Sequence, residues 1–210
     1  LIMTADWKEV LLAYLHDPPD KALRLSHHVS RALRNVEIAV GGLLDKQNLK
    51  KKVAESDRLA SMIERLPMPK AWKKGESGRT VWPKNNLLKI IHPLSGLPKD
   101  LIGLPKPNKA LIKKEHSELD TIVQGLSDTN NEQFLAIWRL WPDALKNVNP
   151  CFARLPADTR IPDHTIWNHL DMTAALKVAK TGGQEAGLLL FSLGPVQPFI
   201  EASRSVRDLW

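Results

Sequence analysis

Cysteine is nearly absent from this chain of 210 residues, and so is any long apolar run. The one cysteine is Cys151, which excludes an intramolecular disulfide and a zinc site built from several thiolates. No apolar stretch reaches the roughly 20 residues that a membrane-spanning helix needs. The first residues also lack the basic segment and apolar core of a secretory signal. These absences favour a protein of the reducing cytoplasm without a membrane partner.

Acidic residues are outnumbered by basic ones. Lysine and arginine total 30 against 23 aspartates and glutamates, which gives a formal net charge of +7. A basic chain suits a polyanionic partner such as a nucleic acid, but the same charge is also typical of an ordinary solvated surface. Charge alone leaves both interpretations open. The length suffices for one or two domains with a substantial core.

Apolar residues recur at helical spacing through most of the chain, which predicts a mainly α fold. Pro18-Pro19 ends the first helix and Gly41-Gly42 the second. Trp138 and Trp141 are expected to be buried by the same helix. The helices are expected at residues 4–16, 26–40, 46–65, 116–126, 130–146 and 163–180.

Two segments depart from the helical pattern. From Pro67 to about Lys114, prolines, glycines and lysines dominate, which predicts a long insertion with little regular structure. Residues 187–193 are typical of a buried strand, and Gly194-Pro195 then turns the chain into another helix. Because one strand cannot satisfy its own edges, we expect residues 187–210 to begin a second, sheet-containing domain.

The adjacent His16 and Asp17 are the first candidates for chemistry. They follow the first expected helix and precede the rigid turn at Pro18-Pro19. An imidazole nitrogen and a carboxylate oxygen can ligate one metal ion such as Zn, Mn, Fe or Ni. The dipeptide gains weight from other ligand-type residues in segments that look helical.

Asp57 and His169 are the strongest of these further candidates. Asp57 shares a helical face with Val53 and Ala60, and a carboxylate on an apolar face needs a cation or a metal ion. The alternative is a salt bridge to an arginine such as Arg31 or Arg58. His169 is expected to point inward, either as a ligand or as a hydrogen-bonded core residue. His164 lies five residues before His169, about 140° away around a regular helix, so the two are not expected to share an ion.

Four separated strings resemble one known family, the large subunit of type III CRISPR effector complexes in its Cmr (III-B) branch. The strings are Leu15 to Leu23, Ser56 to Ser61, Pro156 to Leu170 and Ser192 to Arg204. The resemblance covers the N-terminal part of that subunit. It implies a permuted, all-helical HD-superfamily phosphohydrolase domain over residues 1–184, with an insertion at 67–150. The first strand and helix of an α/β palm domain would follow at 185–210.

The resemblance also implies a set of site residues around one or two divalent ions (Mn, Ni, Mg or Zn). Lys21 is expected to screen charge beside the catalytic His16 and Asp17. Three further residues would either support the ligands from behind or help to bind a second ion. They are His27, Asp163 and His164. The metal ligands would be His16, Asp17, His28, Asp57 and His169.

The implied activity is hydrolysis of phosphodiester bonds in single-stranded DNA, in antiviral defence, by a ribonucleoprotein of several subunits, a guide RNA and a target RNA. In the insertion, Lys73, Lys74 and Lys84 would form a path for the strand, and Trp72 and Trp82 would stack on bases. The alternative for the insertion is a solvated loop. The Gly-Gly-Asp-Asp motif that cyclic oligoadenylate synthesis requires in this family is absent from the chain.

Two further interpretations of function stay open. One is a catalytically silent structural module of the ribonucleoprotein, which the Pro18-Pro19 turn favours because many HD enzymes carry glycine and lysine there. The other is a phosphohydrolase of small nucleotides, which the palm-like residues at the end of the chain disfavour.

Overall fold

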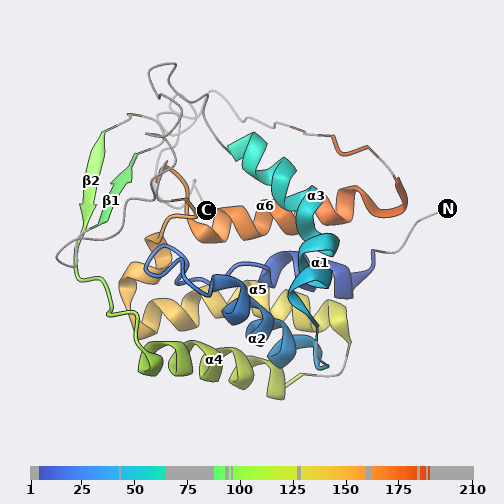
Figure 1. Cartoon of the computed structure of the whole chain (residues 1–210), viewed down its shortest axis with the longest axis horizontal. Coiled ribbons are helices and arrows are strands. Elements are labelled where there is room, and N and C mark those ends of the chain that lie inside the picture. The colour runs from blue at the N-terminus through green and yellow to red at the C-terminus, as the bar shows by residue number, and fades with distance from the viewer. Residues whose placement is uncertain are drawn as a thin grey trace, which may run out of the picture.

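Helices form most of the structure, so the prediction of a mainly α fold is confirmed. The computed structural model describes residues 5–42, 44–64, 88–92, 95, 97–126, 129–158, 162–183, 185–187 and 189. Within these residues, six α-helices surround a common core, and two short strands pair at one end (Figure 1). The elements are α1 (Trp7–Leu15), α2 (His28–Val40), α3 (Lys46–Glu64), β1 (Leu88–Ile91), β2 (Pro98–Leu101), α4 (Lys109–Gln124), α5 (Asn130–Val148) and α6 (Ile166–Ala179).

The helix α1 lies at the centre of the fold. Asp6 caps it, and the Asp6 side chain accepts hydrogen bonds from the backbone of Lys8 and Glu9 at 3.1 and 3.3 Å. From Val10 to Leu15 every residue is at most 2% exposed, because α2, α3, α5 and α6 all pack against this helix (Figure 1). A helix that is apolar on all sides is stable only when it is surrounded in this way.

The helix α6 begins at Ile166, later than the expected start at residue 163. Thr165 and Asn168 form a reciprocal capping box, which fixes the first turn. Asp163 and His164 therefore precede the helix instead of belonging to it. From this start, α6 packs against both α1 and α3 (Figure 1).

The helix α5 covers another side of α1 and also contacts α4. Ile137, Trp141 and Leu145 follow one another at four-residue steps and are fully buried. The expected burial of Trp138 is wrong, because its side chain sits at the edge of this stripe and is 44% exposed. Its indole donates a hydrogen bond to Asp171 on α6 at 3.0 Å.

The segment from Pro67 to about Lys114, expected to have little regular structure, contains two strands and the start of a helix among its described residues. The strands β1 and β2 are antiparallel, with Leu88 opposite Leu101, and both of these side chains are buried. The helix α4 begins at Lys109, well before the expected residue 116, because Asn108 caps it. Residues 65–87 lie outside the described residues. They include the expected strand path at Lys73, Lys74 and Lys84 and the tryptophans Trp72 and Trp82.

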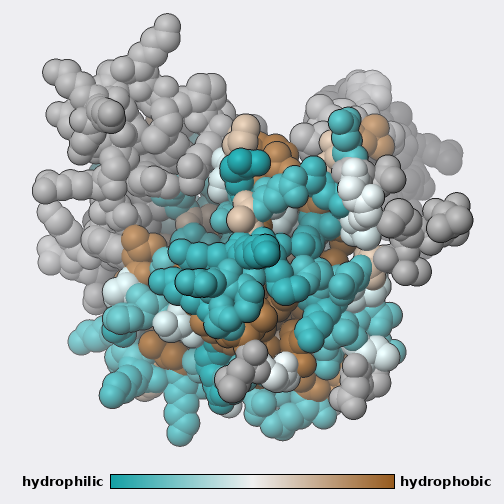
Figure 2. All heavy atoms as spheres, turned by 45° about the vertical axis from the view of Figure 1, so that its right-hand side comes forward, coloured by the Kyte–Doolittle hydropathy of each residue, from teal (hydrophilic) through white to brown (hydrophobic). Residues whose placement is uncertain are grey.

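The end of the chain is described only in part. In the strand expected at 187–193, the described residues are Gly187 and Leu189, and the Leu189 side chain is 93% exposed. The remaining residues to 210, including the expected palm helix, lie outside the described residues. Among the helices that are described, none has the length and apolarity to cross a membrane. Hydrophilic side chains cover most of the described surface on the face in Figure 2.

Candidate metal centre

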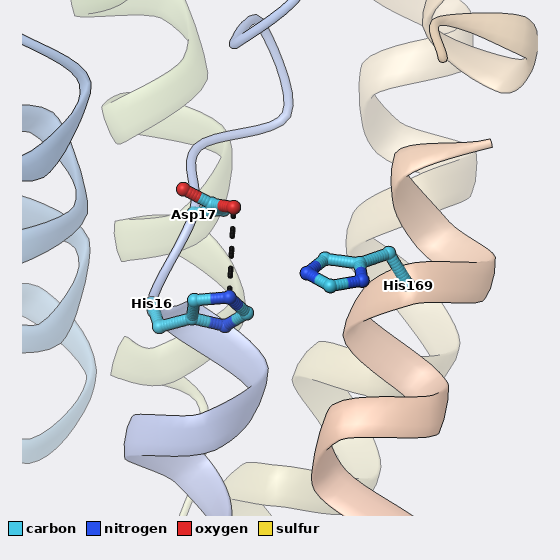
Figure 3. Close-up of side chains that lie close together, drawn as sticks. All are labelled: His16, Asp17 and His169. Atoms are coloured by element: carbon cyan, nitrogen blue, oxygen red, sulfur yellow. Dashed lines mark ion pairs between the residues drawn. The ribbon is translucent and has the colours of Figure 1, made fainter. Parts of the chain in front are cut away.

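Three helices bring ligand-type side chains together at the end of α1. His16 is the C-cap residue of α1, Asp17 follows it, and His169 faces them from α6 (Figure 3). His16 Nε2 lies 3.5 Å from Asp17 Oδ2, and the two imidazole rings are 5.3 Å apart between centroids. One ligand atom from each of the three residues lies within 4.8 Å of the other two. His169 is 4% exposed, so its expected inward orientation is confirmed.

Asp57 joins this group from α3. Its Oδ1 lies 3.7 Å from His16 Nε2 and 3.2 Å from His169 Nε2. The side chain is 44% exposed, although Val53 and Ala60 on the same stripe are buried. Asp57 is therefore less buried than its place on the apolar stripe suggested, and it lines an open cavity.

Arg31, the alternative partner considered for Asp57, binds another carboxylate. Its Nε and Nη2 donate hydrogen bonds to Asp20 Oδ1 at 3.0 and 2.8 Å. The same guanidinium also donates to the backbone carbonyls of Arg24 and Ser26. Arg31 thus holds the loop that follows Asp17, and Asp20 at its centre is fully buried.

The orientation of His16 suits a metal ligand. Its Nδ1–H donates to the Ala13 carbonyl at 2.7 Å, so Nε2 is the nitrogen that would bind an ion. That Nε2 atom is buried and has no hydrogen-bond partner among the described residues. A buried polar atom without a partner is costly, and a cation between the imidazoles and carboxylates would satisfy it. Two imidazoles with two carboxylates form a donor set that suits Zn, Mn, Fe or Ni.

Positive neighbours keep both carboxyl groups ionised. Burial would by itself raise the pKa of Asp17, but His16, Lys21 and His169 hold that pKa below its usual range. The Lys21 ammonium pairs directly with Asp17 Oδ2. Burial likewise acts to raise the pKa of Asp57, but the neighbouring His16 and His169 side chains hold it far below its usual range. Both acids therefore present negative charge to the centre.

A cavity of about 290 Å³ opens onto the centre. His28 lines this cavity, and its Nδ1–H donates to the Leu25 carbonyl at 2.8 Å, so Nε2 is again the nitrogen that would bind an ion. His27 does not line the cavity; it is exposed and holds a left-handed backbone with φ of 59°. The lining residues include His16, Asp17, Lys21, His28, Lys50 and Asp57.

Glu64 is a site residue that our sequence analysis missed. Its Oε2 lies 2.7 Å from His169 Nδ1 and 3.5 Å from His164 Nε2. Glu64 follows Asp57 by two helical turns on α3, so the same-face spacing that singled out Asp57 also marks Glu64. Asp163 Oδ1 lies 2.7 Å from His164 Nδ1.

His164 and His169 are brought to the same carboxylate, which corrects the expectation that they diverge. That expectation assumed one regular helix through both residues, whereas α6 starts only after His164. One ligand atom each from Glu64, His164 and His169 lies within 4.8 Å of the others. His169 therefore belongs to two groups, one at each ring nitrogen.

His169 carries the charge that balances these acids when no cation is bound. Burial acts to lower its pKa, but hydrogen bonds with Asp57 and Glu64 and the charges of Glu64 and Asp17 raise the pKa to about 9. A metal ion must displace this proton from Nε2 before His169 can act as a ligand.

Comparison with known proteins points to one group of relatives. No family model matches the chain. The chain is 31% identical to the CRISPR system Cmr subunit Cmr2 of Pyrococcus furiosus, over 97% of this chain and 27% of that protein. It is 29% identical to the CRISPR system CMR subunit Cmr2 of Saccharolobus solfataricus, over 95% of this chain and 20% of that protein. The chain thus spans about a quarter or less of the length of the curated relatives it matches.

Proposed function

We propose that this chain is the HD-type nuclease domain of a type III-B CRISPR effector large subunit and that it hydrolyses single-stranded DNA with a divalent metal ion. The observation that carries the proposal is the convergence of His16, Asp17, Asp57 and His169 from three helices. The similarity to two Cmr2 proteins along nearly the whole chain supports the family. In this proposal residues 1–184 form the nuclease domain and 185–210 begin a palm domain.

The four converging residues would hold the ion, and His28, which lines the same cavity, would contribute to a second one. A divalent ion supplies a water of lowered pKa and positive charge for the phosphate oxygens. The chain itself fixes the His16 tautomer through the Ala13 carbonyl and keeps Asp17 and Asp57 ionised. Each ligand is thus in the protonation state or orientation that binding requires, apart from the proton on His169.

Basic side chains at the cavity suit a phosphodiester substrate. Lys21 and Lys50 both line it, and the Lys21 ammonium remains beside Asp17. These two lysines attract the phosphate backbone and offset the charge of the two carboxylates. The partners that follow from the proposal are the other subunits of the effector complex, a guide RNA and a target RNA.

A second candidate function is that of a structural module without turnover. It is favoured by the ion pair between Lys21 and Asp17, because the ammonium occupies an oxygen that a cation would need. The buried Pro18-Pro19 turn holds Lys21 near that oxygen. In this alternative the site would stabilise the domain within the complex and perform no hydrolysis.

Cleavage of a fluorescent single-stranded DNA separates the two functions. The chain is incubated with Mn²⁺, Ni²⁺ or Mg²⁺, alongside an Asp17→Ala variant and a Glu55→Gln control. Glu55 is an exposed acid on α3 that pairs with Lys180, away from the centre. Cleavage that is lost in Asp17→Ala and kept in Glu55→Gln supports the nuclease. Absence of cleavage with every ion in folded protein supports the structural module.

A further inference from the structure

We propose that Glu64 is a positioning residue of the metal centre, which holds His169 so that its Nε2 faces the ion. The inference rests on the proposed metal centre, but it concerns a residue outside the ligand set. Glu64 contacts His169 at Nδ1, on the opposite edge of the ring from Asp57. It therefore acts on the ion through the imidazole.

The two nitrogens of His169 have separate partners. Nε2 lies 3.2 Å from Asp57 Oδ1 in the ligand group, and Nδ1 lies 2.7 Å from Glu64 Oε2. The side chains of His169 and Glu64 are only 5% and 8% exposed, so water does not compete for this hydrogen bond. The bond fixes both the rotation of the ring and the nitrogen that keeps the proton when an ion is bound.

A carboxylate behind a metal-binding histidine has a known chemical effect. It orients the ring and makes the other nitrogen a stronger donor. Glu64 has the geometry for both effects, since its Oε2 accepts a hydrogen bond from the Nδ1–H at 2.7 Å. His16 obtains the same tautomer from a neutral carbonyl, so His169 is the ligand whose donor strength depends on a charge.

Two more residues continue this chain of contacts behind Glu64. His164 Nε2 lies 3.5 Å from Glu64 Oε2, and Asp163 orients His164 through its Nδ1 at 2.7 Å. The second oxygen of Glu64 is buried and has no hydrogen-bond partner among the described residues. A buried carboxylate is costly unless it is paired, and the partners of Glu64 are the imidazoles of His169 and His164. Its charge therefore acts on these histidines.

The same atoms offer one competing explanation, a second ion held by Glu64, His164 and His169. We favour positioning because Nδ1 of His169 cannot keep its 2.7 Å hydrogen bond to Glu64 and also bind an ion. The two explanations differ in the number of ions bound, which can be counted.

The test measures the affinity and stoichiometry of Zn²⁺ by competition with a chelating indicator. The variants are Glu64→Gln, which keeps an oxygen acceptor without charge, and Glu64→Leu, which removes both. Glu55→Gln on the same helix is the matched control for lost charge. We expect Kd to rise about 10-fold in Glu64→Gln and by up to about 100-fold in Glu64→Leu, with unchanged stoichiometry and an unchanged control. Should Glu64→Leu fail to fold, Glu64→Gln alone decides.

A spectroscopic measurement distinguishes positioning from a merely structural role. In Zn²⁺-loaded protein with ¹⁵N-labelled histidine, NMR should find the His169 proton on Nδ1, with a resonance that shifts in Glu64→Gln. An unchanged Kd in both Glu64 variants overturns the inference. So does loss of one of two bound ions in Glu64→Gln, since Glu64 would then be a ligand. Wild-type protein that binds no ion overturns both proposals, whereas Zn²⁺ binding that responds to Glu64 without any DNA cleavage overturns the proposed function alone.

Discussion

The proposed metal centre depends on His16 and Asp17, and the His16 side chain makes few other contacts. His16 Nε2 is without a hydrogen-bond partner among the described residues, and its Nδ1 bond to Ala13 spans a single helical turn. The helix α1 owes its position to the apolar residues before His16. Replacing either site residue should therefore affect the ion more than the fold.

We predict that His16→Ala and Asp17→Asn each lower the metal content of dialysed protein at least about 10-fold, since each removes a ligand. The metal-free variants should unfold within a few degrees of metal-free wild type. Elemental analysis and thermal unfolding in a chelator measure both quantities. Metal occupancy equal to wild type in both variants would contradict the proposed centre.

The buried acid Glu115 gives a prediction about pH. Burial and the nearby charge of Asp20 raise the pKa of Glu115 well above its ordinary value, and Arg31 only partly offsets them. A folded-state pKa above the unfolded value means that protonation stabilises the fold. This stabilisation is complete below about pH 4.5, the unfolded pKa of a glutamate. It is lost as the pH rises towards the folded-state pKa.

Glu115→Gln should remove this loss because the amide stays neutral. In a chelator, the melting temperature of wild type relative to Glu115→Gln should fall between pH 5 and pH 8. Asp120→Asn, an exposed change on the same helix, should parallel wild type. Parallel curves for wild type and Glu115→Gln would refute the buried proton.

The sequence predicted the orientation of those side chains at the centre whose helical face follows from their spacing. His169 and Asp57 fall on faces that meet because each helix kept its expected period through these residues. Glu64 was missed because a lone acid near a helix end resembles an exposed residue. Its place on the Asp57 face was readable from the spacing, but its burial depends on the tertiary contact between α3 and α6.

At the scale of elements, the start of α6 positions the residues around Glu64. Thr165 caps this helix and places His164 just before it. We predict that Thr165→Ala lowers the free energy of unfolding by about 1 kcal/mol, since the variant lacks the hydroxyl that accepts from the Asn168 backbone and donates to Asn168 Oδ1. Denaturant unfolding measures this change. Thr121→Ala, at an exposed position within α4, should cost less.

Helices with a strong apolar period were predicted well, whereas irregular segments were not. The helix α3 spans Lys46–Glu64 against an expectation of 46–65. The strands β1 and β2 escaped prediction because each has four residues and β2 starts with proline in a mostly exposed Pro-Lys-Asp sequence. The helix α4 starts earlier than expected because Asn108 caps it. The capping signal was missed because Asn108 lies in a segment with several prolines.

At the scale of the whole molecule, the net charge of +7 predicts an electrostatic share in binding single-stranded DNA. We predict that replacing Lys73, Lys74 and Lys84 together by alanine weakens binding and flattens its salt dependence. The slope should change by about 0.7 for each phosphate that the variant no longer neutralises. Affinities measured by fluorescence anisotropy over a range of salt concentrations test this.

The control for that prediction carries the same change in charge. Alanine at the exposed α4 positions Lys109, Lys113 and Lys114 removes three positive charges on a helix that does not line the cavity. Equal salt slopes for wild type and the Lys73, Lys74 and Lys84 variant would argue against a strand path there. If the salt dependence of binding flattens equally in both variants, binding depends on net charge and not on a defined path for the strand.

The burial of α1 on every side also constrains how the centre can move. Because its residues Val10 to Leu15 have no solvent-facing side, their amide hydrogens can exchange with heavy water only when the whole helical assembly opens. His16 follows this helix directly, so its backbone amide should also be protected from hydrogen exchange. Binding of the ion should therefore leave the conformation of α1 unchanged. Hydrogen exchange in α1 should slow only to the extent that the ion adds to the stability of the fold.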